Sequence, residues 1–338
     1  MRRNAAPTID MVAARAGVGR GTVSRVINGS PQVSEKARSA VESAVRELGY
    51  VPNQAARTLV TQRTDTVALV ITASTERLWG EPYFAGIIQG ISRQLDDLGF
   101  HLLLTMAETQ EERTKLESYL LGRHVDGALL VSLHAKDALA RRLHRAGLPV
   151  VLCGAPMDRL RVPFVDSDNI DGARQAVRHL LSTGRRRIAT VAGPQDMAAG
   201  RDRLTGYRRA LAEAGVIVDE SLVAVADFTE AGGLTATRDL LDRAADLDAV
   251  FAASDPMAFG ALRALRDRDR SVPDDVAVVG FDDSPLALHT HPPLSTVNQP
   301  VESMGRRMAS LLVAQIRDEP IEPNGTVLAT RLMVRGSS

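Results

Sequence analysis

The sequence predicts a small all-helical head, a hinge helix, and an α/β core made of two parallel-sheet lobes. Two short amphipathic helix patterns flank a turn at Gly17, and alternating strand and helix patterns begin at Thr66. Charge divides the chain at the same place. Residues 1–65 hold ten Lys or Arg against five Asp or Glu, a charge of +5; the totals of 41 and 41 leave 31 and 36, or −5, for the rest. A basic head on an acidic body is typical of a protein whose head meets nucleic acid.

The head begins with a helix–turn–helix pattern. Thr8 is placed to cap the first helix, and Gly17 to make the turn. The small core is expected to contain Ile9, Val12, Ala13, Val18, Val23 and Val26. The polar side of the second helix carries Arg20, Thr22, Ser24, Arg25 and Asn28. Such side chains reach base edges and phosphates in the DNA major groove, so we expect the chain to bind a specific DNA sequence.

A third helix and a short hinge follow. Ser34 is placed to cap the third helix, and Gly49 to end it. Pro52 stops that helix, and Asn53 starts a hinge helix of about two turns that runs to Val60. A helix this short is marginal in water, so it is expected to form only when something packs against it.

The core pattern consists of two series of strands and helices. The first series predicts strands at Val67–Ile71, Leu102–Leu104, Ala128–Val131 and Val150–Leu152, with helices near 84–95, 110–121 and 136–146. The second predicts helices near 170–182, 200–213, 231–242 and 256–266, with strands at Ile188–Val191, 222–225, Ala249–Ala252 and Val276–Gly280. A ligand is expected between the lobes, at the carboxyl ends of the strands. A further helix at 301–312 and a strand near 326–330 indicate that the chain crosses back into the first lobe.

Several absences narrow the function. Cys153 is the only cysteine, which excludes an internal disulfide and favours a reducing compartment. Arg2 and Arg3 are followed by no apolar signal region, and no apolar run reaches membrane-spanning length, so a cytoplasmic protein is expected. No nucleophile-elbow, zinc-protease or phosphate-loop motif occurs, and His289 and His291 have no further metal ligands. We therefore expect no enzymatic activity, cofactor or metal.

Groups of residues with a distinctive order and spacing run along the whole chain. They are Ala16-Gly17-Val18, Thr22-Val23-Ser24-Arg25-Val26, Leu48-Gly49-Tyr50-Val51-Pro52-Asn53, Val165-Asp166-Ser167-Asp168-Asn169, Arg203-Leu204, Gly206-Tyr207, Val279-Gly280-Phe281-Asp282-Asp283 and Pro293-Leu294-Ser295-Thr296-Val297. In this order the chain resembles the LacI/GalR family of bacterial transcription repressors. The resemblance implies a homodimer with two DNA-binding heads and a core similar to periplasmic sugar-binding proteins.

The resemblance also implies domain boundaries and DNA-contacting positions. The head spans 1–50, the hinge and linker 51–65, the N-terminal lobe 66–164 plus 296–324, and the C-terminal lobe 165–295 plus 325–338. The implied DNA contacts are Thr8, Arg20, Gly21, Thr22, Ser24, Arg25, Asn28, Ser34, Tyr50, Asn53, Ala56, Arg57 and Leu59.

Two of these positions have distinct implied roles. Arg20 is placed to contact guanine, while Leu59 matches the residue that wedges into the central minor groove. The alternative for Leu59 is an apolar linker residue packed on the core. The sequence departs from the family at Met11, where a first-turn acid is usual, and at Gly19, where a serine is usual.

The resemblance implies a small-molecule effector in the cleft, most often a sugar. The implied contacts are Arg203, Phe228, Ser254, Asp255 and Asp282, to which we add Trp79 because an indole stacks well on a sugar ring. Two alternatives stay open: Asp255 as a structural residue at a helix start, and Trp79 on the surface or in a dimer interface. Cys153 and Gly154 stand where some relatives have a ligand-binding acid, which puts a simple monosaccharide pose in doubt.

The function predicted from these observations is a repressor released from a palindromic operator by a small sugar, with disaccharides and oligosaccharides included. Effector binding is expected to shift the closure of the lobes and so separate the two hinge helices. One alternative is the same DNA-binding role with a nucleobase or phosphorylated effector acting as co-repressor. The other is a sugar-binding protein without a DNA function.

Overall fold

The computed structural model describes residues 7–27, 30–51, 63–158, 160–321 and 325–338. It divides into two compact units, Met1–Thr64 and Asp65–Ser338, which we describe separately. The predicted hinge helix lies outside the described residues.

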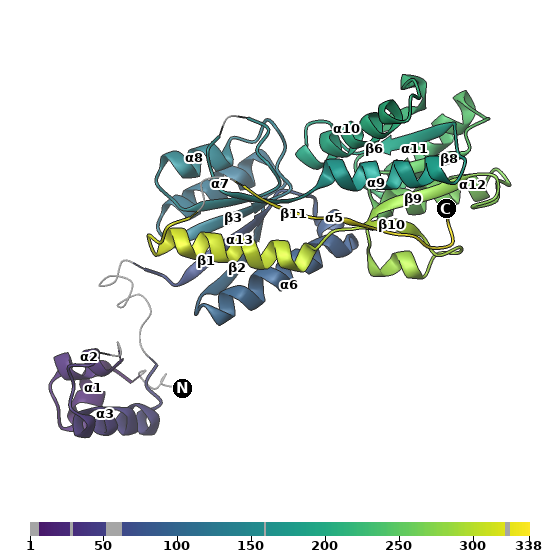
Figure 1. The fold of residues 1–338 in the computed structure, drawn as a ribbon. Coiled ribbons are helices and arrows are strands. Elements are labelled where there is room, and N and C mark those ends of the chain that lie inside the picture. Colours follow the sequence, from purple (N-terminus) through teal and green to yellow (C-terminus); the bar gives the residue numbers. More distant parts are fainter. Residues whose placement is uncertain (1–6, 28–29, 52–62, 159, 322–324) are drawn as a thin grey trace. The chain divides into compact units, whose positions relative to one another are not determined.

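The first unit is a three-helix head with α1 (Ile9–Ala16), α2 (Arg20–Ile27) and α3 (Glu35–Leu48) (Figure 1). The hydroxyls of Thr8 and Ser34 accept hydrogen bonds from the first turns of α1 and α3, and Gly17 and Gly49 end these helices with left-handed φ angles of 67° and 60°. The apolar faces meet in one core of Val12, Ala13, Val23, Val26, Val41 and Ala44. These findings confirm the predicted helix–turn–helix.

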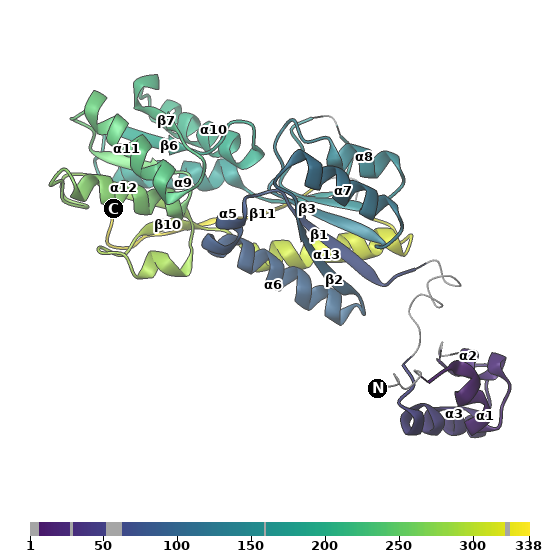
Figure 2. The same cartoon turned by 180° about the vertical axis from the view of Figure 1, so that it is seen from behind.

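The second unit has two lobes, each with a six-stranded sheet. The sheet of the first lobe has the order β11-β5-β4-β3-β1-β2, and all its neighbours are parallel. Its strands are β1 (Thr66–Ile71), β2 (His101–Met106), β3 (Gly127–Val131), β4 (Val150–Cys153), β5 (Phe164–Ser167) and β11 (Thr326–Leu328). One face carries α6 (Pro82–Asp97) and α13 (Val301–Ile316), which lie side by side in Figures 1 and 2. The other carries α7 (Gln110–Leu121) and α8 (Leu139–Arg145).

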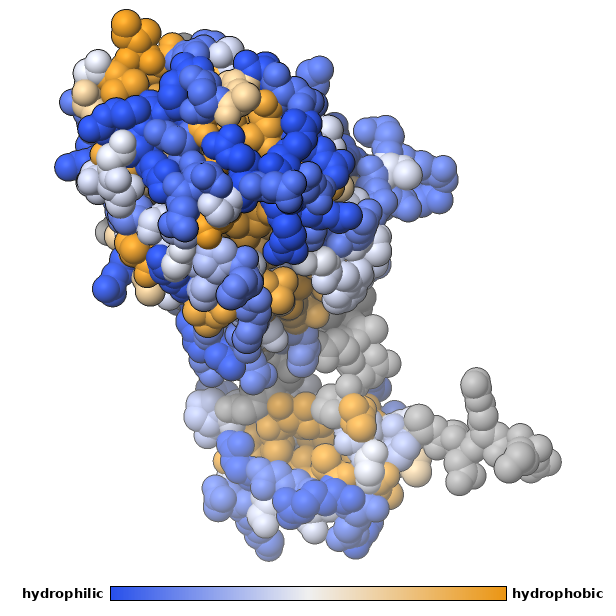
Figure 3. Space-filling model, turned by 90° about the vertical axis from the view of Figure 1, so that its right-hand side faces the viewer, coloured by the Kyte–Doolittle hydropathy of each residue, from blue (hydrophilic) through white to orange (hydrophobic). Residues whose placement is uncertain are grey.

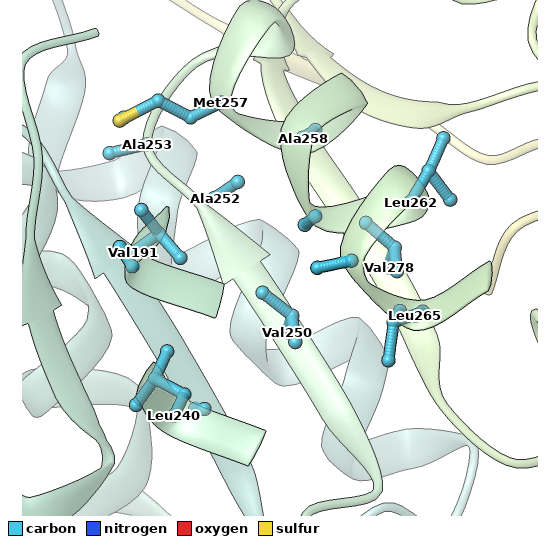
Figure 4. Packing of buried hydrophobic residues seen from close by; sticks show 14 of the residues in the cluster. Val191, Leu240, Val250, Ala252, Ala253, Met257, Ala258, Leu262, Leu265 and Val278 are labelled. Carbon is cyan, nitrogen blue, oxygen red and sulfur yellow. The ribbon is translucent and has the colours of Figure 1, made fainter. Parts of the chain in front are cut away.

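The sheet of the second lobe has the order β12-β10-β9-β8-β6-β7, with only the β10–β12 pair antiparallel. Its strands are β6 (Ile188–Ala192), β7 (Val223–Val225), β8 (Ala249–Ala252), β9 (Ala277–Asp282), β10 (Ser295–Asn298) and β12 (Arg331–Met333). Helices α9 (Asn169–Ser182) and α10 (Ala198–Glu213) cover one face, and α11 (Glu230–Arg243) and α12 (Asp255–Arg266) the other. Short 3₁₀ helices lie at Glu220–Leu222 and Pro285–Leu288. Figure 4 shows Val191, Val250 and Val278 of the sheet facing Leu240 and Leu265 of the helices.

Three short strands shift the lobe boundaries from those predicted. β5 pairs with β4 and β11, so the first lobe continues through Ser167, whereas 165 was predicted as the start of the second. β10 pairs with β9, which places 295–298 in the second lobe. The single strand predicted near 326–330 is two strands, β11 in the first sheet and β12 in the second. The backbone pairing decides these positions, because a strand of three or four residues has little apolar pattern of its own.

The chain is also helical before residue 84, where the predicted helix begins. It contains α5 (Thr75–Gly80), capped by Ser74, and the start of α6 at Pro82. Helix α13 packs against α6, which confirms that the chain crosses back into the first lobe after the second sheet.

The surface of the second unit is mainly hydrophilic in the view of Figure 3, with small apolar patches. None of the helices among the described residues combines the length and the apolar character needed to cross a membrane.

Candidate functional site

The second helix of the head separates its buried side from its exposed side. Val23 and Val26 of α2 are buried against the other two helices, while Arg20, Gly21 and Arg25 are exposed. Arg25 Nε donates to the Gly21 carbonyl at 3.2 Å, which holds the guanidinium along the outer face of the helix. Arg20 lies near the acid of α1, with Nε 3.9 Å from Asp10 Oδ1. The arrangement places Arg20 and a backbone without a Cβ at the start of α2 and Arg25 in its last turn, all on the exposed side, which suits major-groove binding.

The other predicted DNA-contacting residues take mixed positions. Thr22 and Ser24 are half-buried on α2, and Tyr50 packs half-buried against the core of the head. Thr8 and Ser34 are exposed, although their hydroxyls already cap helices. Asn28, Asn53, Ala56, Arg57 and Leu59 lie outside the described residues.

A cavity lies between the two lobes of the second unit, at the carboxyl ends of the parallel strands. It encloses about 1110 Å³ of space, including the part open to solvent. The first lobe contributes Arg77, Glu81 and Tyr83, Asp166 of β5 and residues that follow β3 and β4. The second lobe contributes Asn169 at the start of α9 and residues near the ends of β6, β7, β8 and β9. This is the location that the strand pattern predicts for a ligand.

Arg203 of α10 lies at the centre of the polar contacts in the cavity. Its side chain is only 5% exposed; Nε donates to Asn169 Oδ1 at 2.8 Å, and Nη1 donates to the Ala253 carbonyl at 2.6 Å. The guanidinium carbon lies 3.7 Å from the centre of the Phe281 ring. Nη1 also lies 3.4 Å from Asp282 Oδ1. Arg203 is therefore held rigidly, with its orientation fixed before any ligand arrives.

Asp282 ends β9 with an unusual backbone. Its φ of 123° lies in the region that L-residues rarely adopt, and Oδ1 accepts a hydrogen bond from Gln299 Nε2 at 2.6 Å. Burial raises the pKa of the Asp282 carboxyl to about 6, and Glu81 adds to the rise, while the positive charge of Arg203 opposes it. Gln299 in turn accepts from Ser167 Oγ at 2.6 Å. Gln299 lies between β10 and α13, and Ser167 ends β5. Hydrogen bonds therefore link the Asp282 carboxylate to two of the segments that cross between the lobes.

Phe228 supplies a buried aromatic ring beside Arg203. It follows β7 with a positive φ of 69° and is 6% exposed. A Cβ on Gly193 would lie 2.3 Å from the ring, so glycine at 193 leaves the space that the ring occupies. An aromatic face next to charged hydrogen-bonding groups is the combination that binds sugar rings.

Three other predicted effector contacts differ in outcome. Ser254 lines the cavity, but its hydroxyl caps α12 by accepting from Met257 N at 3.3 Å. Asp255 does not line the cavity; it is fully buried and accepts from Ser284 N at 2.7 Å and Thr296 Oγ1 at 2.5 Å. The ligand contact predicted for Asp255 is therefore wrong, and its alternative, a structural role at a helix start, holds.

Trp79 is also outside the cavity lining, and its side chain is 72% exposed. Helix α5 buries Leu78 and turns Arg77 toward the cavity, which leaves the neighbouring indole pointing outward. The effector contact predicted for Trp79 is therefore wrong, and its place in a dimer interface stays a prediction.

Sequence reasoning missed several polar residues of the cavity. Tyr83 Oη lies 3.2 Å from Cys153 Sγ, and burial raises the pKa of the Cys153 thiol to about 12. Asp166 accepts from Ala155 N at 2.9 Å, and Asn169 holds Arg203. The only signal for Asp166 and Asn169 was their place in the motif at 165–169.

Two pairs of contacting side chains at the cavity and its edge were likewise not predicted. Arg77 Nε and Glu81 Oε1 lie 2.6 Å apart, and the i, i+4 spacing of these residues was the available signal. His134 Nδ1 lies 2.8 Å from Asp196 Oδ2, across the lobes at the edge of the cavity. The backbone reinforces this second contact, since Ala135 N donates to the Asp196 carbonyl at 2.7 Å.

Comparisons with known proteins agree with the two-unit architecture. A model of the lacI family of bacterial regulatory proteins matches residues 8–53, and a periplasmic binding protein-like domain matches residues 177–338. The chain is 57% identical over 339 residues to the HTH-type transcriptional regulator CelR of Thermobifida fusca, covering 100% of both. It is 35% identical to the ribose operon repressor of Escherichia coli (strain K12), covering 98% of this chain and 99% of that protein.

Solved structures extend the agreement to three dimensions. A transcriptional regulator CelR–cellobiose complex aligns with a TM-score of 0.80 at 55% identity, over 98% of this chain and 100% of the other. The lac repressor dimer bound to operator and the anti-inducer ONPF aligns with a TM-score of 0.86 at 28% identity, over 98% of each chain. With relatives that are transcriptional regulators rather than enzymes, the chain belongs to the LacI family and is a sequence-specific DNA-binding transcription regulator.

Proposed function

We propose that the chain is a homodimeric repressor that binds a palindromic operator and is released by a neutral saccharide of the cellobiose class. The DNA part draws on the exposed face of α2 and on the lac repressor dimer, whose structure contains operator DNA. The saccharide part draws on the CelR–cellobiose complex and on the chemistry of the cavity. The protein would act in the cytoplasm and associate with the nucleoid when bound to DNA.

The observation that carries the effector class is the charge pairing inside the cavity. Each arginine among its described lining residues has a carboxylate partner: Arg77 with Glu81, Arg141 with Asp158, and Arg203 with Asp282. A buried phosphate would need a cation that is not already neutralised, because burying an uncompensated charge is costly. Neutral hydroxyl groups, in contrast, hydrogen-bond to both members of such pairs. This favours a sugar over a phosphorylated effector.

The aromatic contacts favour a sugar over a flat nucleobase as well. Phe228 is already approached by two arginines, whose guanidinium carbons lie 5.7 and 5.8 Å from its centre. A ligand that packs on the Phe228 ring therefore has guanidinium donors and carboxylate acceptors around an apolar surface. That mixture suits a pyranose, which has one apolar face and a rim of hydroxyls.

The mechanism follows from the position of the cavity between the lobes. The His134–Asp196 pair and the Ala135–Asp196 backbone bond join loops of opposite lobes at its edge. A ligand held by both lobes changes the population of closed states, and the hinge segments transmit this change to the heads. Operator affinity falls because the hinge helices lose the arrangement that allows them to fold on DNA.

The test is fluorescence anisotropy of the full-length protein on an operator selected from random DNA, at fixed salt. Cellobiose, glucose, glucose 6-phosphate and adenine are titrated separately, and a scrambled duplex serves as the control. We expect cellobiose to lower operator affinity at least tenfold, with no comparable effect of the phosphorylated sugar or the base. An effector response confined to glucose 6-phosphate or adenine, or a tightening of operator binding by cellobiose, would overturn the proposal.

A further inference from the structure

A second arginine–carboxylate pair lies across the cavity from Arg203 and Asp282. Arg77 and Glu81 are one helical turn apart where α5 meets α6, and both line the cavity. Their contact is bidentate: Nε to Oε1 is 2.6 Å, and Nη2 to Oε2 is 3.2 Å. The side chains are 16% and 13% exposed, unlike the ordinary surface ion pairs of this chain.

The backbone beneath this pair is held firmly. Ser74 Oγ caps α5 by accepting from Arg77 N at 3.3 Å, and Leu78 on the same helix is 3% exposed in the core of the first lobe. Thr75 Oγ1 donates to Glu108 Oε1 at 2.6 Å, which joins α5 to the segment after β2. The pair is thus presented on a fixed support, as a binding site requires.

One aromatic ring connects the two pairs. The guanidinium carbon of Arg77 lies 5.7 Å from the centre of the Phe228 ring, and that of Arg203 lies 5.8 Å from the same centre. Arg77 belongs to the first lobe and Arg203 to the second. A ligand beside Phe228 therefore has one arginine–carboxylate pair within reach in each lobe.

We propose that the Arg77–Glu81 pair is the subsite for the second sugar ring and selects disaccharides over ligands with a single sugar ring. The inference rests on the proposed saccharide function. The first ring contacts Arg203 and Asp282, and the hydroxyls of the second ring exchange hydrogen bonds with Arg77 and Glu81. A ligand whose second ring carries no hydroxyls leaves the remaining polar atoms of Arg77 and Glu81 buried without hydrogen-bond partners. Such a ligand therefore binds more weakly than a disaccharide.

The test compares cellobiose with phenyl β-D-glucoside, which keeps one glucose ring and replaces the other by an apolar ring. Isothermal titration calorimetry on the full-length protein without DNA gives both dissociation constants for the wild type, for Arg77→Leu/Glu81→Leu, and for Glu81→Gln. The matched control is Arg208→Leu/Glu220→Leu, which removes an exposed arginine–glutamate pair of the second lobe with a 2.7 Å contact. Circular dichroism checks folding, and Glu81→Gln, which keeps the side-chain shape, carries the test if the double variant does not fold.

We expect the wild type to prefer cellobiose, and the double variant to reduce that preference at least tenfold, with a smaller reduction in Glu81→Gln and none in the control. The same preference in the wild type and both variants overturns the inference, as does equal wild-type affinity for the two ligands. If the wild type binds neither ligand, the proposed saccharide function itself fails, which separates the two conclusions.

Discussion

Phe228 shows how single residues set the shape of the cavity. Its ring occupies the space that a side chain on Gly193 would need, and its backbone has a left-handed φ of 69°. The Phe228 carbonyl accepts from Ser254 Oγ at 3.4 Å, so the cap of α12 also supports the ring. The position of this ring therefore depends on Gly193, which does not line the cavity.

Gly193→Ala tests this dependence. A Cβ would lie 2.3 Å from Cζ of Phe228, so the ring must move, and we expect cellobiose affinity to fall at least tenfold in calorimetric titrations. Gly80→Ala is the matched control, because no atom lies within 4 Å of its added Cβ. Unchanged cellobiose affinity in Gly193→Ala would show that Phe228 does not contact the effector.

Asp255 gives the stability of the core a pH dependence. Burial raises the pKa of its carboxyl to about 8, and Asp282 adds to the rise, so the folded state binds a proton that the unfolded state releases above about pH 4. Its contribution therefore makes the protein less stable as pH rises from 4 to 8. We expect Asp255→Asn to raise the melting temperature by a few degrees at pH 8 and much less at pH 5, measured by calorimetry. A larger gain at pH 5 than at pH 8 would contradict the assignment.

At the scale of elements, the eight residues of α2 both pack against the other helices of the head and present side chains for DNA binding. Val23 and Val26 anchor it, while Arg20 and Arg25 remain exposed. Buried and exposed residues alternate along this short helix. We therefore expect a substitution on its exposed side to change DNA binding without disturbing the core of the head.

Arg20→Ala should lower operator affinity by about 1–3 kcal/mol, the range for an arginine that reads a guanine. Arg15→Ala is the control, because Arg15 is an exposed arginine of the same head that pairs with Glu47. Anisotropy on operators with single base changes measures both affinity and discrimination. Arg20 would be a phosphate contact instead if the variant lost affinity equally for every operator.

Elements with strong local signals were predictable from sequence, and those without were not. The cap at Ser34 marks the start of α3 and Gly49 marks its end. Continuous apolar runs indicated β1, β3 and β8. Strands β5, β10 and β12 were missed because they are short and contain polar residues, so their pairing depends on distant partners. The same reason explains the site. Arg203 and Asp282 lie in recognisable motifs and Phe228 matches a position of the family, whereas the Arg77–Glu81 pair comes together only when α5 is folded against the first lobe.

At the scale of the whole molecule, the proposed repressor needs a hinge that responds to the core. Leu59 lies outside the described residues, and its role as a minor-groove wedge stays a prediction. We expect Leu59→Ala to weaken operator binding at least tenfold while leaving cellobiose affinity within twofold of the wild type, measured by anisotropy and calorimetry. Equal operator affinity of variant and wild type would remove the hinge from the mechanism.

The chain passes between its two lobes three times, after β5, after β10 and after β11, whereas it passes from the head to the core only once, between Thr64 and Asp65. A recombination event at that one boundary transfers a complete head to a foreign core. No single breakpoint transfers a lobe, since each sheet is completed by strands from distant parts of the sequence. New pairings of operator and effector can therefore spread by shuffling of genes, whereas new effector preferences must accumulate by substitution within an unbroken core.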